Sequence, residues 1–239
     1  MTFDKITAGW CPVCEQDTAF RSKNPWLRDH YRCARCQSMP RQRHLMYILN
    51  QIRPNWRSLT IHESSPGGAT FVKMREECPN YSFSHYLPDT QLGGIDPQSG
   101  TRSEDLRQMT FMDQSFDIFV TQDVLEHIYS PAKVFSEIHR VLKNDGIHIF
   151  TVPIYKALPQ SRKRAELNQN GEILHLHDAV YHGNPISSLG SLVTYDWNLD
   201  IVHAIYKETG MITTVYLTRD EHLGLEAEFL EVLVSEKME

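Results

Sequence analysis

A nearly continuous apolar run, Phe116-Asp-Ile-Phe-Val-Thr-Gln122, is the feature that most constrains the fold of this chain. Strands of this kind are buried on both faces, as they are in parallel sheets covered by helices. Further strand-like and helical segments alternate along the chain, at residues 58–63, 69–78, 81–86, 131–142 and 147–152. This alternation predicts an α/β protein with a mostly parallel sheet and helices on both faces.

The C-terminal part of the chain continues the pattern. A helix is expected near residues 197–209, and two strand-like runs follow at residues 212–218 and 229–235, close enough to form a hairpin. Two turns are also expected: Asn144-Asp145-Gly146 should close the preceding helix, and residues 91–104 should form an irregular loop because they are rich in Gly, Asp, Pro and Ser.

Four of the five cysteines form two C-x-x-C pairs near the N-terminus, Cys11-Pro-Val-Cys14 and Cys33-Ala-Arg-Cys36. This spacing is typical of a zinc ribbon, in which two turns direct four thiolates at one ion. Because protein atoms would fill all four positions, the zinc would be structural and would stabilise a segment too short to form its own core. Cys78 stands alone and is expected to be a buried, inert thiol.

The chain of 239 residues is long enough for one α/β core and an appendage. We therefore expect a zinc-ribbon-like module at residues 1–39 and a bridging helix within residues 40–57, with its apolar spacing at 41–53. The main domain would then occupy residues 58–239. No run of about 18 apolar residues or signal peptide is present, so we expect a cytoplasmic protein with no membrane span.

The charge of the chain is unevenly distributed. The formal net charge is −6, yet Asp29 is the only acid between Ala19 and Arg57. That basic segment contains nine cationic side chains: Arg21, Lys23, Arg28, Arg32, Arg35, Arg41, Arg43, Arg53 and Arg57. The segment either forms a solvated basic face or faces a phosphate, a nucleic acid or an acidic surface.

Three segments together resemble the class I S-adenosylmethionine-dependent methyltransferases, over residues 59–239. They are Ser115-Phe-Asp-Ile-Phe-Val-Thr-Gln-Asp-Val-Leu-Glu-His-Ile128, Ile138-His-Arg-Val-Leu-Lys-Asn-Asp-Gly146 and Ile149-Phe-Thr-Val-Pro153. They look like the fourth strand of this family, its Val-Leu-Glu-His signature, a helix end and the fifth strand. The resemblance implies a Rossmann-like sheet of seven strands with the last strand antiparallel.

The resemblance also implies where S-adenosylmethionine binds. Glu63-Ser-Ser65-Pro-Gly67-Gly68 lies where the family has an acid followed by a glycine-rich turn, with Glu63 as the acid and Ser65 in place of a glycine. The family's ribose-binding acid has no certain counterpart here, and Ser84, His85 or Tyr86 would replace it. The remaining implied cofactor residues are Asp105 and Leu106 at the adenine, and Gln122 and Asp123 beside the sulfonium.

A polar, histidine-rich insertion at residues 156–195 lies where this family usually covers the methyl acceptor. Within Ile173-Leu-His175-Leu-His177-Asp-Ala-Val-Tyr181-His182-Gly-Asn-Pro185, His182 and His175 are candidate general bases. Tyr181 would be a pocket wall or a hydrogen-bond donor. The alternatives are that His175, His177, Asp178 and His182 bind a metal, or that the histidines are ordinary loop residues. Glu126 and His127 would either support the strand or act directly in catalysis.

Three functions follow from these patterns. The first is O-methylation of a small polar metabolite, such as a sugar or a natural-product hydroxyl, because the insertion is rich in His and Asn. The second is methylation of RNA docked on the zinc module and the basic segment. The third is a scaffold that keeps the cofactor fold without turnover, suggested by the irregular Glu63–Gly68 turn.

Overall fold

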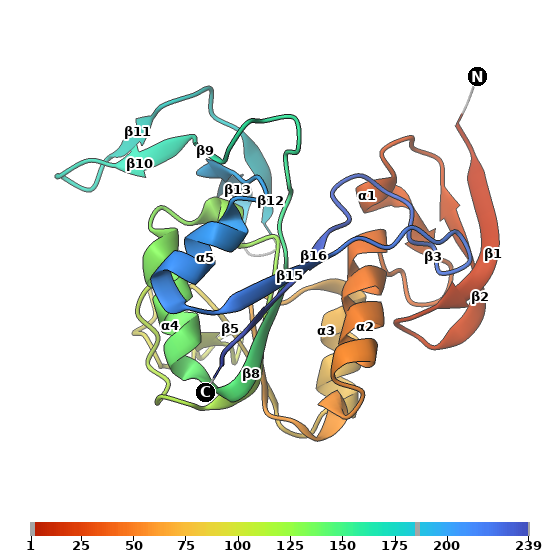
Figure 1. The fold of residues 1–239 in the computed structure, drawn as a ribbon, viewed down its shortest axis with the longest axis horizontal. Helices are drawn as coiled ribbons and strands as arrows, with labels where there is room; N and C mark the ends of the chain where they lie inside the picture. The colour runs from red at the N-terminus through yellow and green to blue at the C-terminus, as the bar shows by residue number, and fades with distance from the viewer. Residues whose placement is uncertain (1–2, 185–186, 239) are drawn as a thin grey trace.

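The computed structural model describes residues 3–184 and 187–238, so Pro185 of the expected insertion lies outside the described residues. Its main feature is a seven-stranded sheet in the order β6-β5-β4-β7-β8-β16-β15 (Figure 1). The strands from β6 to β8 are parallel, whereas β16 is antiparallel to both of its neighbours. The strands are β4 (Ile61–Ser64), β5 (Tyr81–His85), β6 (Arg102–Ser103), β7 (Phe116–Gln122), β8 (Leu142–Thr151), β15 (Ile212–Tyr216) and β16 (Val232–Glu236).

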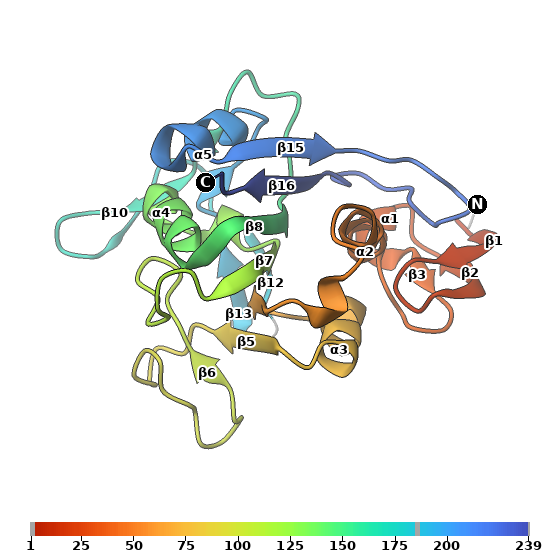
Figure 2. The same ribbon diagram turned by 60° about the horizontal axis from the view of Figure 1, so that its bottom comes forward.

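Helices cover both faces of the sheet, as the alternating pattern predicts (Figure 2). Helices α2 (Pro40–Ile52) and α3 (Gly68–Glu77) pack on one face, and α4 (Pro131–Val141) and α5 (Ile201–Thr209) pack on the other. Adjacent residues of β7 point to opposite faces of the sheet. Ile118 packs in the core with α2, while Phe119 packs in the core with α4 and α5. The α/β fold class and the closing antiparallel hairpin are confirmed.

The N-terminal segment packs directly against α2. It contains β1 (Lys5–Cys11), β2 (Gln16–Ser22), α1 (Leu27–His30) and β3 (Arg32–Cys33), followed after α2 by the 3-10 turn η1 (Trp56–Ser58). Phe20, Tyr31 and Leu45 belong to one buried core with Ile118. The loop between β15 and β16 crosses this segment, where Trp10 N donates to His222 O at 2.8 Å. The N-terminal segment therefore shares its core with one face of the sheet.

Buried Arg43 on α2 contacts both the N-terminal segment and the loop between β15 and β16. Its guanidinium donates to the backbone oxygens of Ser38, Tyr31 and Gly224, and it lies 4.4 Å from the ring centroid of Phe20. Four hydrogen bonds to these three oxygens and the neighbouring aromatic ring satisfy a charge that would otherwise be costly to bury.

The expected insertion contains three small antiparallel pairs of strands. The pairs are β9 (Arg162–Lys163) with β14 (Tyr195–Asp196), β10 (Ala165–Leu167) with β11 (Ile173–His175), and β12 (Tyr181–Asn184) with β13 (Ser187–Leu192). Thr194 N donates to Glu126 O at 2.7 Å, which fixes the end of the insertion on the short 3-10 turn η2 (Leu125–His127) that follows β7.

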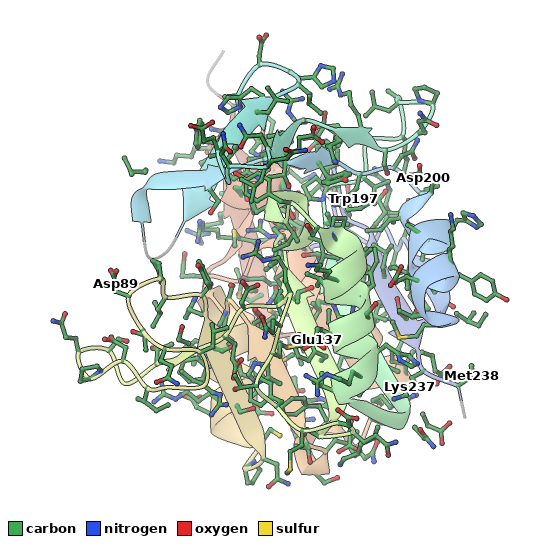
Figure 3. All side chains as sticks on the ribbon, turned by 90° about the vertical axis from the view of Figure 1, so that its left-hand side faces the viewer. Asp89, Glu137, Trp197, Asp200, Lys237 and Met238 are labelled. Atoms are coloured by element: carbon green, nitrogen blue, oxygen red, sulfur yellow. The ribbon has the colours of Figure 1, made fainter. Side chains whose placement is uncertain are left out.

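The expected turn at residues 144–146 is wrong, because β8 begins at Leu142 directly after α4. Asp145 adopts a left-handed φ of 59° within the strand, and its N–H donates to Lys237 O. The Nζ of Lys237 donates to His139 O and Leu142 O, both at 2.9 Å, so a lysine closes the helix instead of a glycine turn. Figure 3 shows Lys237 below the end of α4 and Trp197 beside its other end.

Other expected boundaries also shift: the helix expected at residues 197–209 begins at Ile201, and the strand expected at residues 229–235 begins at Val232. The strand expected at residues 58–63 begins only at Ile61, because η1 precedes it. The loop expected at residues 91–104 ends in β6, whose Ser103 is fully buried. Among the described residues, no helix is long and apolar enough to cross a membrane.

Candidate active site

The turn after β4 bends through two left-handed residues. Ser65 has φ 55° and Gly68 has φ 72°, so Ser65 adopts a conformation that favours the glycine it replaces in the resemblance. A Cβ on Gly68 would lie 2.1 Å from Gln42 Nε2, which donates to Gly67 O at 3.0 Å. The side chain of Gln42 on α2 therefore packs against the turn and requires glycine at position 68.

Glu63 lies fully buried at the end of β4. Its carboxylate accepts hydrogen bonds from Tyr81 Oη at 2.6 Å and Gln122 Nε2 at 2.7 Å. Burial raises the pKa of Glu63 to about 7, although both hydrogen bonds oppose this shift. Gln122 also donates to Thr70 Oγ1, while its own Oε1 is buried without a hydrogen-bond partner among the described residues. An orphaned acceptor beside the turn fits a ligand that donates a hydrogen bond there.

The residues expected at the adenine and ribose lie at the same sheet edge. Asp105 and Leu106 follow β6; Asp105 pairs with Arg107 at 2.6 Å, and Leu106 is buried in the core with α4. Arg107 lowers the pKa of Asp105, against the opposing effect of burial. Tyr86 follows β5 and is exposed, whereas Ser84 is buried and bonded to His62 Nε2.

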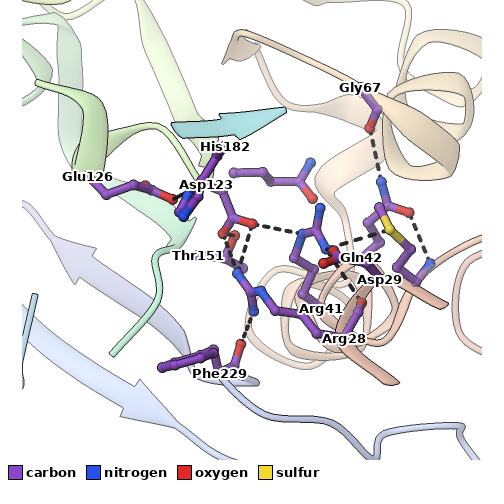
Figure 4. A network of polar contacts seen from close by, with 12 residues as sticks. Arg28, Asp29, Arg41, Gln42, Gly67, Asp123, Glu126, Thr151, His182 and Phe229 are labelled. Atoms are coloured by element: carbon purple, nitrogen blue, oxygen red, sulfur yellow. Dashed lines mark hydrogen bonds and ion pairs between the residues drawn. The ribbon is translucent and has the colours of Figure 1, made fainter. Parts of the chain in front are cut away.

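Asp123 lies in the densest polar network of this region (Figure 4). Arg28 Nη2 lies 2.8 Å from both carboxylate oxygens of Asp123, and Arg41 Nε lies 3.0 Å from Oδ2. Thr151 Oγ1 donates a hydrogen bond to Oδ1 at 2.9 Å. Burial opposes ionisation, but the two guanidinium groups outweigh it and hold the pKa of Asp123 at about 2. Asp123 also has a left-handed φ of 53°. The N-terminal segment and α2 thus each supply one cation to the end of β7.

Glu126 and His127 of η2 meet His182 of β12. Glu126 Oε1 lies 3.7 Å from His182 Nδ1 and 3.9 Å from His127 Nε2. The two imidazole rings are 5.2 Å apart, edge to face. Glu126 is 1% exposed, whereas His182 is half-buried. This cluster combines a carboxylate with two imidazoles, groups that accept protons or bind metal ions.

The other residues expected from the insertion lie apart from this cluster. His175 is exposed on the separate β10–β11 hairpin, as are His177 and Asp178 just after it. Tyr181 precedes His182 on β12 and is 56% exposed. Adjacent strand residues point to opposite faces, so Tyr181 and His182 face different ways. Of the three candidates, His182 is the one that the structure places beside other functional groups.

The four N-terminal cysteines converge on one point. Their sulfur atoms all lie within 4.8 Å of one another, with Cys11 and Cys36 at 3.7 Å and Cys14 and Cys33 at 3.9 Å. Four sulfurs bound to zinc at about 2.3 Å in a tetrahedron are separated by roughly 3.8 Å. Both C-x-x-C turns close alike, by a hydrogen bond from Glu15 N to Cys11 O and from Gln37 N to Cys33 O. The geometry fits a tetrahedral zinc ion.

The basic segment is largely engaged within the protein. Arg28 and Arg41 pair with Asp123, Arg43 is buried, Arg53 pairs with Glu236, and Arg57 pairs with Glu15 and Glu77. Arg21, Lys23 and Arg32 instead line a hollow on the N-terminal segment together with His30. The positive charge of this basic segment therefore forms internal ion pairs and also lines part of the surface.

Sequence reasoning missed three residues at this site: Arg28, Arg41 and Gln42. The only signal was the scarcity of acids between Ala19 and Arg57, which left Asp29 as the one acidic partner within the segment. Their partners lie far along the chain, at Asp123 and at the turn after β4.

Residues 87–150 match the protein family described as "Methyltransferase domain". Among solved structures, an S-adenosylmethionine-dependent methyltransferase from Mesorhizobium loti is 16% identical, with a TM-score of 0.50, and the match covers 81% of this chain and 98% of that one. A putative one from Listeria monocytogenes is 14% identical, with a TM-score of 0.51 and coverage of 82% and 99%.

DesVI from Streptomyces venezuelae has the same TM-score of 0.51 at 10% identity, with coverage of 82% and 92%. At these identities the structural likeness shows the fold alone. The residues matched by the family, 87–150, include Asp105, Gln122, Asp123 and Glu126. The comparison with curated proteins found no match. The chain therefore has the Rossmann-like α/β fold of these methyltransferases, and residues 87–150 match the methyltransferase-domain family.

Proposed function

We propose that this protein methylates a hydroxyl oxygen of a small polar molecule, with S-adenosylmethionine as the methyl donor. The observation that carries the proposal is the position of His182, which the insertion brings to Glu126 at the carboxyl end of β7. Open α/β sheets bind their ligands at this end of the strands. The cofactor turn and a proton-accepting group thus lie at the same edge of the sheet.

The residues at this edge fit the cofactor. The left-handed turn from Ser65 to Gly68 permits close approach of the backbone, and the orphaned Oε1 of Gln122 is suited to a donor on the ligand. We assign cofactor binding to Glu63, Ser65, Gly67, Gly68, Tyr86, Asp105, Leu106, Gln122 and Asp123. When bound, the cofactor supplies an activated methyl group.

Residues of the chain would align the acceptor and move its proton. His182 is within reach of Glu126, so the carboxylate can fix the ring while a ring nitrogen contacts the acceptor hydroxyl. Tyr181 and His175, both exposed, would then contact the acceptor from the rim of the insertion and not at the reacting oxygen.

We also propose that the four cysteines bind a structural zinc ion and that residues 1–39, 40–57 and 58–239 are the zinc module, the bridging helix and the catalytic domain. The sulfur separations support the ion, because they are close to those of a tetrahedral site. A reducing compartment such as the cytoplasm would keep the four thiols available, and we place the enzyme there.

RNA methylation is a second candidate function, supported by the hollow that Arg21, Lys23 and Arg32 line. The internal pairing of Arg28, Arg41, Arg43, Arg53 and Arg57 weighs against it, because these cations already have partners. Binding through the hollow would weaken steeply as salt increases.

The test is to incubate the enzyme with methyl-labelled cofactor and panels of glycosides, phenols and RNA. Label in a small hydroxyl compound supports the proposal, and its loss in His182→Asn assigns the acceptor site. His203, exposed on α5, provides the matched control, since His203→Asn should leave labelling unchanged. Label found exclusively in RNA or protein would reject the small-molecule acceptor, and the triple variant Arg21→Ala/Lys23→Ala/Arg32→Ala would then test the hollow.

A further inference from the structure

We propose that Glu126, His127 and His182 bind one divalent transition-metal ion. Each residue offers one ligand atom, and the three atoms lie within 4.8 Å of one another. Ligands bound to one ion at about 2.1 Å are separated by roughly 3.0 to 3.4 Å. The separations of 3.7 and 3.9 Å from Glu126 Oε1 to the two imidazoles are slightly wider, so small rotations of the side chains would close them around an ion.

The carboxylate of Glu126 lacks the hydrogen bonds that a buried charge needs. Both of its oxygens are buried without a hydrogen-bond partner among the described residues, and the side chain is aimed at the two histidines. Burying a carboxylate without partners costs several kcal/mol, so such groups are normally paired or coordinate a metal. A cation between Glu126 and the imidazoles would remove this cost.

His127 is already oriented as a metal ligand. Its Nδ1 lies 2.9 Å from the carbonyl oxygen of Leu192, and a carbonyl can only accept, so Nδ1 carries the proton. In the neutral ring Nε2 then presents a lone pair toward Glu126 Oε1 at 3.9 Å. Two acceptors that face each other are satisfied either by a shared proton or by a metal ion between them, and the proposed site takes the second form. A backbone carbonyl on the far nitrogen is also the usual partner of a metal-bound histidine.

The ligand set indicates the class of ion. Two imidazoles and one carboxylate suit zinc, manganese or ferrous iron better than calcium or magnesium, which prefer all-oxygen sites. Asp123 nearby is already held by Arg28 and Arg41, so it does not supply a fourth ligand. Three protein ligands leave positions open for an outside oxygen.

The metal site would explain how the proposed reaction activates its acceptor. That the outside oxygen is an acceptor hydroxyl rests on the proposed function. An acceptor hydroxyl bound to the ion would have a lowered pKa and would release its proton to water, keeping the electron pair on oxygen for methylation. His182 would then act as a metal ligand instead of a base.

The test uses the full chain loaded with one equivalent of zinc, which fills the cysteine site and leaves the proposed site free. This protein is titrated with Mn²⁺, and binding is followed by the electron paramagnetic resonance signal of free Mn²⁺. We expect saturable binding of one Mn²⁺ per chain. Glu126→Gln and His182→Asn should weaken it by more than roughly 100-fold, since loss of an outer partner alone costs about 10- to 100-fold. His203→Asn should bind like the unchanged protein.

Absence of saturable Mn²⁺ binding, or equal binding by Glu126→Gln, would overturn the proposed metal site. Binding of S-adenosylhomocysteine is measured on the same preparations, so the two proposals fail separately. If the protein binds the nucleoside but does not bind Mn²⁺, the proposed function stands and the metal site is rejected. If it binds Mn²⁺ but does not bind the nucleoside, the metal site stands and the proposed function is rejected.

Discussion

Arg28 Nη2 lies 2.8 Å from both carboxylate oxygens of Asp123, across 95 positions of the sequence. The other terminal nitrogen of Arg28 donates to Phe229 O, so one guanidinium joins α1, the end of β7 and the loop between β15 and β16. Arg41 on α2 contacts the same carboxylate. The N-terminal segment is thereby fixed beside the candidate active site by charge as well as by apolar packing.

The Arg28–Asp123 pair should show strong energetic coupling. Arg28→Ala leaves a mostly buried carboxylate with a single guanidinium, so a double-mutant cycle with Asp123→Asn should give a coupling of about 1 to 3 kcal/mol. Arg53→Ala, which removes the exposed pair with Glu236, should cost less than about 1 kcal/mol. Urea unfolding measures each free energy, and strictly additive effects of the two substitutions would contradict the coupling.

The cysteine site should contribute one zinc ion per chain in elemental analysis. Cys33→Ser should abolish it and lower the Tm by roughly 10 °C or more, because the N-terminal segment shares the core of α2 and the sheet. Cys78→Ser, which changes a buried thiol outside the cluster, should keep the ion. Full stability of Cys33→Ser without zinc would reject a structural role for the ion.

Gly67 and Gly68 should respond differently to alanine. Gly67 has an extended φ of −169° and open space around its missing Cβ, so Gly67→Ala should change the free energy of unfolding by less than about 0.5 kcal/mol. Gly68→Ala requires a left-handed alanine that collides with Gln42 and should cost more than about 1 kcal/mol. Adding Gln42→Ala should recover part of this loss; similar costs for both single variants would contradict the geometry.

Three buried groups should make stability depend on pH between 5 and 7. Burial lowers the pKa of both His62 and His148 to about 3, below the unfolded value near 6.5. Because the unfolded chain then binds protons more readily, each histidine lowers the stability of the folded protein as the pH falls. Burial raises the pKa of Glu63 to about 7, so its contribution changes in the opposite direction and is lost as the pH rises.

Substitutions should separate these two effects. Between pH 7 and pH 5, His62→Asn should reduce the loss of stability by about 2 kcal/mol, whereas Glu63→Gln should increase it by about 2 kcal/mol. Urea unfolding at the two pH values measures both. Shifts of the same sign in the two variants would show that the assigned protonation states are wrong.

The sequence predicted the elements whose pattern is local. The apolar run of β7 and the spaced Val134, Phe135 and Ile138 of α4 report burial directly, because each residue's environment follows from the period of its own element. The two C-x-x-C pairs likewise fix their own turns. These features required no knowledge of distant parts of the chain.

Features that depend on distant partners could not be predicted in this way. Lys237 closes α4 from the far end of the chain, so the helix needs no glycine and β8 can begin at Leu142. Arg28 looked like a surface cation because nothing near it in sequence marks Asp123 as its partner. The insertion pattern also gave no reason to prefer His182 over His175, since only pairing of β12 with β13 places His182 beside Glu126.

Calorimetric titration of the purified protein with S-adenosylhomocysteine tests the central claim most directly. We predict one site per chain with a micromolar dissociation constant. Binding should be weakened by Asp105→Asn, at the proposed adenine end, and unaffected by Asp89→Asn in the neighbouring exposed loop. Folded, zinc-loaded protein that shows no binding of this nucleoside would contradict the assignment of the Glu63–Gly68 turn and the methyl transfer that depends on it.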